Sequence, residues 1–221
     1  MSVSSGANGA RPRAVVIDYG AGNLHSIARA MQRAGLAPEV TADPLAATDA
    51  DLLVLPGQGR FGQVARAFAA SGFEPLVRDH IAAGRPFLGV CVGLQLLLER
   101  SEEDPDVPGL GIVPGEVRRF SGAVRVPQMG WNSITKLGSP TLFNGVPDGA
   151  YVYFANSYYA LPRGVGASAP GTTTSYGATE FRSAFSLGNL HATQFHPEKS
   201  QAVGLRVLEN LRRSLVVGGA A

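Results

Sequence analysis

The stretch Pro86-Phe87-Leu88-Gly89-Val90-Cys91-Val92-Gly93 decides the fold of this chain. The apolar run at 86–90 predicts a buried strand, and the sequence at 94–100 predicts a helix. Glycines two positions before and after Cys91 allow the sharp strand-to-helix turn on which a nucleophile is presented. The sequence therefore predicts a nucleophile elbow at Cys91.

Cys91 is the only cysteine among 221 residues. A single cysteine is often no more than a small buried hydrophobic residue, and this alternative stays open on the residue alone. The predicted position next to a helix N-terminus favours a thiolate, because the helix dipole and the free N–H groups stabilise negative charge. A nucleophilic role also requires a base elsewhere in the chain.

A base is available in the segment Gln194-Phe195-His196-Pro197-Glu198-Lys199-Ser200. Pro197 favours an extended backbone at His196, and residues two apart in an extended segment point to the same side. We expect Glu198 to hold one ring nitrogen of His196, while the other nitrogen accepts the thiol proton. The alternative is a surface turn without a catalytic role.

Around this elbow, strands alternate with helices. Strands are expected at 14–18, 39–42, 52–55 and 86–90, and helices at 23–34, 61–70 and 75–83. From 109 to 186, short alternating segments between Gly, Pro and Asn turns predict antiparallel strands; a last strand is expected at 191–195 and a closing helix at 201–217. The fold class is α/β, with a mostly parallel central sheet, helices on both faces and a smaller antiparallel sheet.

Composition agrees with a compact soluble enzyme. The chain is 45% hydrophobic and 16% charged, with a net charge of +2 and no Lys/Arg run that would mark a nucleic-acid face. Residues 1–13 are expected to form a flexible N-terminal tail and residues 14–217 a single domain. The single cysteine excludes an internal disulfide, and we see neither a signal peptide nor a membrane segment, so we expect a cytoplasmic location.

The segment Gly57-Gln58-Gly59-Arg60-Phe61-Gly62 matches the glycine pattern of dinucleotide sites. That pattern belongs in the first strand–helix turn, whereas here it follows the third predicted strand. We expect an oxyanion hole instead, in which the backbone N–H of Gln58 or Gly59 acts together with that of Val92. With four histidines and one cysteine we find no metal-ligand cluster, and neither a metal nor another cofactor is expected.

The elbow and the His-Pro-Glu segment together resemble the class I glutamine amidotransferase family. Four further segments resemble a branch of that family serving histidine biosynthesis, and the resemblance runs from about Ala14 to Leu215; the segments are 18–24, 55–59, 127–132 and 152–159. It implies a Cys91–His196–Glu198 triad that hydrolyses L-glutamine. It also implies a heterodimer with a (βα)8-barrel cyclase subunit, which uses the ammonia to make imidazole glycerol phosphate and aminoimidazole carboxamide ribotide.

The resemblance assigns further residues. Gln95, Ser157 and Tyr158 are expected to contact glutamine, and the expected partner interface contains Asn23, Trp131, Tyr153 and Lys199. For Trp131 the alternative is a core aromatic residue. Gln128 and Asn156 stand where the family commonly has histidine, and the long Gln58 side chain departs from the small apolar residue expected there.

Three other functions share part of this pattern. The glutaminase subunit of another synthase, such as pyridoxal phosphate synthase, would have the same triad, but the segments at 130–132 and 153–154 argue against it. A cysteine peptidase or other acyl hydrolase would share the chemistry without selectivity for glutamine. A catalytically silent scaffold for a partner enzyme would have no need of Cys91, His196 and Glu198.

Overall fold

The structure is a computed structural model that describes residues 11–20 and 22–217. Most of the expected tail, residues 1–10, lies outside the described residues, and Arg13 is the first residue of strand β1. The large sheet has eight strands in the order β2 (Ala37–Thr41), β1 (Arg13–Ile17), β3 (Leu52–Gly57), β4 (Phe87–Cys91), β13 (Leu190–Thr193), β12 (Thr179–Leu187), β11 (Gly171–Tyr176) and β8 (Thr135–Leu137).

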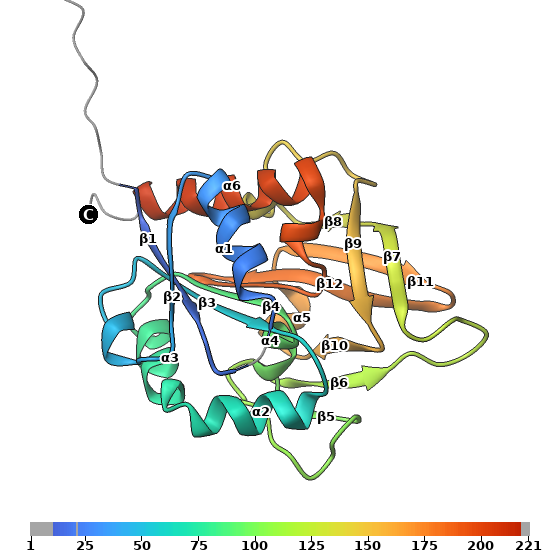
Figure 1. Ribbon diagram of the computed structural model, residues 1–221. Helices are drawn as coiled ribbons and strands as arrows, with labels where there is room; N and C mark the ends of the chain where they lie inside the picture. The colour runs from blue at the N-terminus through green and yellow to red at the C-terminus, as the bar shows by residue number, and fades with distance from the viewer. Residues whose placement is uncertain (1–10, 21, 218–221) are drawn as a thin grey trace, which may run out of the picture.

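The first five strands of this order are parallel and the remaining pairings are antiparallel. Helices α1 (Leu24–Arg33) and α6 (Gln201–Val217) lie on one side of the sheet, and α2 (Phe61–Ala70) and α3 (Phe73–Ala82) lie on the other (Figure 1). Strands β1, β3 and β4 are almost continuously apolar because helices cover both of their faces. The predicted α/β class is confirmed.

The antiparallel strands are distributed differently from the single small sheet we expected. Some of them extend the large sheet, and the others form two small sheets. A three-stranded sheet contains β10 (Tyr158–Pro162), β6 (Gly115–Arg119) and β5 (Arg100–Ser101), and in it β10 runs antiparallel to β6 whereas β5 runs parallel to it. A two-stranded antiparallel sheet contains β7 (Gln128–Ser133) and β9 (Tyr151–Asn156). Short helical segments are α4 (Val92–Leu96), α5 (Val165–Ser168), η1 (Leu45–Ala47), η2 (Thr141–Phe143) and η3 (Pro197–Lys199).

The helix predicted at 94–100 is wrong in extent, because α4 ends at Leu96 and Arg100 already belongs to β5. The backbone carbonyls of Leu96, Leu97 and Leu98 accept hydrogen bonds from the amides of residues 110, 113 and 111, at 2.7, 2.9 and 3.1 Å. These bonds to a distant loop replace the bonds that would have continued the helix.

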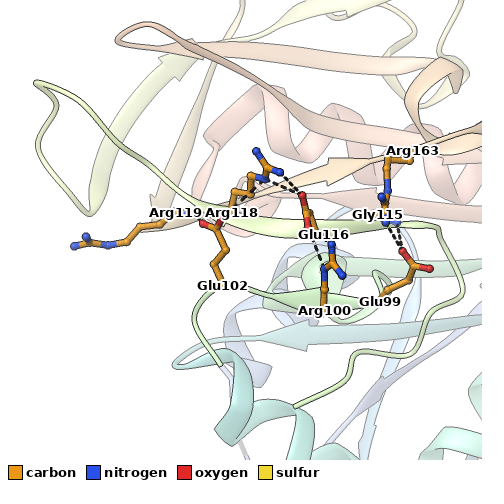
Figure 2. Close-up of polar contacts among 8 residues, drawn as sticks. All are labelled: Glu99, Arg100, Glu102, Gly115, Glu116, Arg118, Arg119 and Arg163. Carbon is orange, nitrogen blue, oxygen red and sulfur yellow. Dashed lines mark hydrogen bonds and ion pairs between the residues drawn. The ribbon is translucent and has the colours of Figure 1, made fainter. Parts of the chain in front are cut away.

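Ion pairs hold the edge of the three-stranded sheet, as Figure 2 shows. Glu116 of β6 accepts from Arg100 at 2.8 Å and from Arg118 at 2.5 Å, and these bonds hold the pKa of Glu116 below its usual range. Glu99 pairs with Arg163 at 2.9 Å. The arginines are about half exposed, so each pair contributes little stability by itself. The pair Arg100–Glu116 links the side chains of the neighbouring strands β5 and β6.

Two structural features are absent from the described residues, 11–20 and 22–217. Within these ranges no helix combines the length and the apolarity needed to cross a membrane. The same ranges contain no group of three or more His, Cys, Asp or Glu side chains placed to hold a metal ion.

Candidate active site

The chain turns sharply at Cys91, where β4 ends and α4 begins. Cys91 has φ 55° and ψ −109°, which is a strained conformation for a residue with a side chain. A Cβ on Gly93 would lie 1.9 Å from the Leu55 carbonyl oxygen, and one on Gly89 would lie 2.9 Å from the Gly93 carbonyl oxygen. The two glycines therefore allow α4 to pack directly against β3 and β4, and the elbow has the predicted geometry.

Cys91 opens onto a cavity of about 240 Å³. Gly57 of β3 is paired with Cys91 of β4, so the segment after β3 lies beside the thiol at the carboxyl edge of the sheet. The structure brings most of the predicted site residues together around this cavity, namely Gln58, Gly59, Cys91, Val92, Gln95, Ser157, Tyr158 and His196. These residues come from segments that are far apart in the sequence.

His196 and Glu198 form a hydrogen-bonded pair. His196 Nδ1 lies 2.9 Å from Glu198 Oε1, and both side chains are only 3% exposed. The extended segment that we expected is present only at His196, because residues 197–199 form the 3-10 helix η3. The tight turn still places the carboxylate against the ring, and it leaves Nε2 as the nitrogen available to Cys91.

The electrostatic environment favours a charged imidazolium. Burial lowers the pKa of His196, but hydrogen bonds with Cys91 and Glu198 outweigh this effect and raise the pKa to about 10. A thiolate next to an imidazolium is the reactive form of a cysteine nucleophile.

Sequence reasoning missed two residues of this site. Glu103 lines the cavity, and its Oε2 accepts a hydrogen bond from the Phe61 amide at 2.7 Å. Gln194 is fully buried, and its Nε2 lies 3.6 Å from Cys91 Sγ. Glu103 belongs to an acidic run without helical or strand periodicity, so the run itself does not indicate a site. Its position after the predicted elbow was the only sequence signal for Glu103. Gln194 stands two residues before His196, and that proximity was the available signal.

The residues expected at a partner interface fall into two groups. Trp131, Tyr153 and Lys199 lie together: the Trp131 and Tyr153 rings are 6.0 Å apart, and Lys199 Nζ is 5.7 Å from the Tyr153 ring centroid. Trp131 is 45% exposed, so it is not a core aromatic residue. Asn23 instead lines a small crevice that also touches Gln58 and Glu198.

Gln128 and Asn156 are cross-strand partners in the pair β7–β9. Both side chains are buried. The Asn156 amide donates to the Tyr158 carbonyl at 2.9 Å, whereas the Gln128 amide makes no hydrogen bond within the described part of the chain. Asn156 also lines the cavity, so this position contributes to the wall of the site.

Comparison with known proteins identifies the family. The model of the family "Glutamine amidotransferase class-I" matches residues 15–212. The subunit HisH of imidazole glycerol phosphate synthase from Deinococcus radiodurans is 51% identical over 208 residues, which cover 93% of this chain and 95% of that protein. The protein of the same name from Thermus thermophilus is 52% identical over 205 residues, covering 92% and 97%.

Solved structures give the same fold at lower sequence identity. PurLQS from Thermotoga maritima superimposes with a TM-score of 0.73 at 19% identity, covering 93% of this chain and 99% of that chain. A glutamine amidotransferase from Thermotoga maritima gives a TM-score of 0.58 at 18% identity, covering 96% and 86%. At this identity the likeness concerns the fold alone.

Proposed function

The chain belongs to the class I glutamine amidotransferase family, in the branch of the HisH subunits of imidazole glycerol phosphate synthase, and from this premise we propose that Cys91, His196 and Glu198 are its catalytic triad. The chain is an enzyme that takes ammonia from glutamine. One observation carries the assignment of the triad: the strained Cys91 elbow and the buried His196–Glu198 pair meet at one cavity.

In the proposed reaction, the Cys91 thiolate attacks the side-chain amide carbon of L-glutamine. Backbone N–H groups of Gln58 or Gly59 and of Val92 hold the developing oxyanion. The His196 imidazolium gives its proton to the nitrogen of the tetrahedral adduct, the C–N bond breaks, and ammonia leaves while Cys91 remains as a glutamyl thioester. His196 then takes a proton from water, the resulting hydroxide attacks the thioester, and glutamate leaves as the thiolate–imidazolium pair is restored.

The cavity contains groups suited to the amino-acid end of the substrate. The Glu103 carboxylate is the acidic group at this cavity that can bind the substrate ammonium, while Gln95, Ser157 and Tyr158 supply polar contacts. Glu198 holds the His196 ring from behind and stabilises its positive charge. With its amino-acid end bound in this way, glutamine places its side-chain amide next to Cys91.

We further propose that the ammonia passes to a (βα)8-barrel cyclase subunit in a cytoplasmic heterodimer. The aromatic and cationic group formed by Trp131, Tyr153 and Lys199 is the docking surface in this proposal. Exposed Met129 and Tyr151 lie on the same two strands and enlarge its apolar area. A surface of this composition is typical of protein interfaces.

The test is glutamate release from glutamine, measured with the chain alone, with the cyclase subunit, and with the cyclase subunit plus its ribonucleotide ligand. Strong release that requires the liganded partner supports the full proposal, and Cys91→Ser abolishes that release. Equal release by the chain alone indicates the glutaminase of another synthase. No release under any of these conditions contradicts the triad and favours a silent scaffold.

A further inference from the structure

Two buried glutamine side chains connect Cys91 to strand β10. Gln194 Nε2 lies 3.6 Å from Cys91 Sγ. Gln95 Nε2 lies 3.1 Å from Gln194 Oε1 and 3.1 Å from the backbone oxygen of Tyr158. Gln194 is 0% exposed and Gln95 is 3% exposed, so water does not compete for these contacts.

Only one assignment of donors and acceptors is consistent with these contacts. A backbone carbonyl accepts hydrogen bonds and never donates them, so the group of Gln95 that faces Tyr158 must be its NH2. That NH2 also faces Gln194, which must therefore turn its amide oxygen toward Gln95. The remaining end of the Gln194 amide, its NH2, then points at the sulfur of Cys91.

We propose that Gln194 is a fixed hydrogen-bond donor to the Cys91 thiolate, and that Gln95 is a positioning residue that sets the orientation of Gln194. The proposal rests on the proposed function, in which the thiolate is the nucleophile, and adds to it a hydrogen-bond donor to the sulfur besides His196. A hydrogen bond to an ionised group is stronger than one between neutral groups, so the donor favours the thiolate over the thiol.

The other ionisable groups near Cys91 do not replace this donor. His196, backed by Glu198, is the cationic partner of the thiol. Burial raises the pKa of Tyr19, and the nearby Cys91 raises it further, but the Tyr19 hydroxyl donates to the Pro56 carbonyl at 2.6 Å. Glu103 lines the same cavity and adds negative charge, which opposes a thiolate. Gln194 is thus a neutral donor in direct contact with the sulfur.

The experiment measures the rate of Cys91 alkylation by iodoacetamide as a function of pH. Because Cys91 is the only cysteine of the chain, every modified thiol is the one of interest. In Gln194→Met the donor is lost, and we expect the pH of half-maximal alkylation to rise by about one unit. In Gln194→Glu a carboxylate faces the sulfur, and we expect a larger rise.

The matched control is Thr193→Val, which removes a buried hydroxyl from the neighbouring position without touching the sulfur. We expect its alkylation midpoint to equal that of the wild type. Thermal unfolding shows which variants fold. Should neither Gln194 variant fold, Gln95→Met serves instead, because Gln194 then loses its fixed orientation and a smaller rise is expected.

Unchanged midpoints in all folded variants of Gln194 and Gln95, or an equal rise in Thr193→Val, would overturn the proposal. Alkylation requires no glutamine and no partner, so its result is independent of the proposed function. A chain that hydrolyses no glutamine but shows the shifts would contradict the function alone. A chain that hydrolyses glutamine without the shifts would contradict the role of Gln194 alone.

Discussion

At the scale of single residues, the reactivity of Cys91 depends on groups that never touch the substrate. Glu198 illustrates this dependence, because its Oε1 is hydrogen-bonded to the ring of His196 and its side chain is almost fully buried. A buried carboxylate beside an imidazolium stabilises the charge and fixes the tautomer. A residue that does not touch the substrate therefore sets the protonation state of His196.

Replacing Glu198 by Gln tests this dependence. We expect glutamine hydrolysis to fall roughly 100-fold to 10,000-fold, because His196 loses the group that stabilises its cation. The pKa of about 10 that His196 has in the wild type should fall, since Glu198 is one of the groups that raise it. The basic limb of the pH–rate profile should accordingly move to lower pH, whereas Glu209→Gln on the exposed face of α6 should leave the profile as it is.

At the scale of elements, the elbow depends on close contact between α4 and β3. In Gly93→Ala the added Cβ would lie 1.9 Å from the Leu55 carbonyl oxygen, so the two elements must separate. We expect the free energy of unfolding to fall by about 3 kcal/mol or more, measured by urea denaturation. The control Gly84→Ala has φ +74° and open space, and its strain should cost only about 1 kcal/mol. Equal losses in the two variants would contradict the packing argument.

Strand β13 contains a buried histidine, His191, which predicts sensitivity to acid. Burial lowers the pKa of His191 to about 4, and its Nδ1 lies 2.8 Å from Ser186 Oγ. Between about pH 6.5 and pH 4 this histidine is protonated in the unfolded chain but not in the folded chain. The free energy of unfolding therefore falls by about 3 kcal/mol as the pH falls through this range. In His191→Leu this slope should flatten, leaving the smaller contribution of His80, whose pKa burial also lowers. An unchanged slope of the unfolding free energy against pH would refute the assignment.

Helices and strands that are determined by their own local apolar pattern were predictable from the sequence. The helix predictions at 61–70 and 201–217 are confirmed to the residue, and the strand at 86–90 is confirmed within one residue. The end of α4 was not predictable, because hydrogen bonds to a distant loop decide it. The turn of η3 was not predictable either, because three residues are too few to show a periodic pattern. Gln194 was missed because its role depends on Gln95, which lies on another element. The division at 13 and the single domain stay predictions.

At the scale of the whole molecule, β9 connects the exposed aromatic group to the proposed triad. The ring of Tyr153 packs against Trp131 and lies under Lys199, while its backbone oxygen accepts from the His196 amide at 2.9 Å. The Tyr153 amide in turn donates to Ser200 Oγ at 3.0 Å. The proposed docking surface and the proposed general base are therefore joined through one residue of β9, Tyr153.

This arrangement predicts that Trp131→Ala weakens the heterodimer without impairing the chemistry of the isolated chain. Trp131 is an exposed aromatic residue of the type that dominates binding energy at interfaces, and we expect a loss of about 2 kcal/mol, or roughly 30-fold in Kd. Trp131 does not line the Cys91 cavity, so alkylation of Cys91 in the free chain should proceed at the wild-type rate. Titration with the cyclase subunit measures Kd, and Leu45→Ala, an exposed apolar change on η1, is the control. Wild-type affinity in Trp131→Ala would place the partner elsewhere on the molecule.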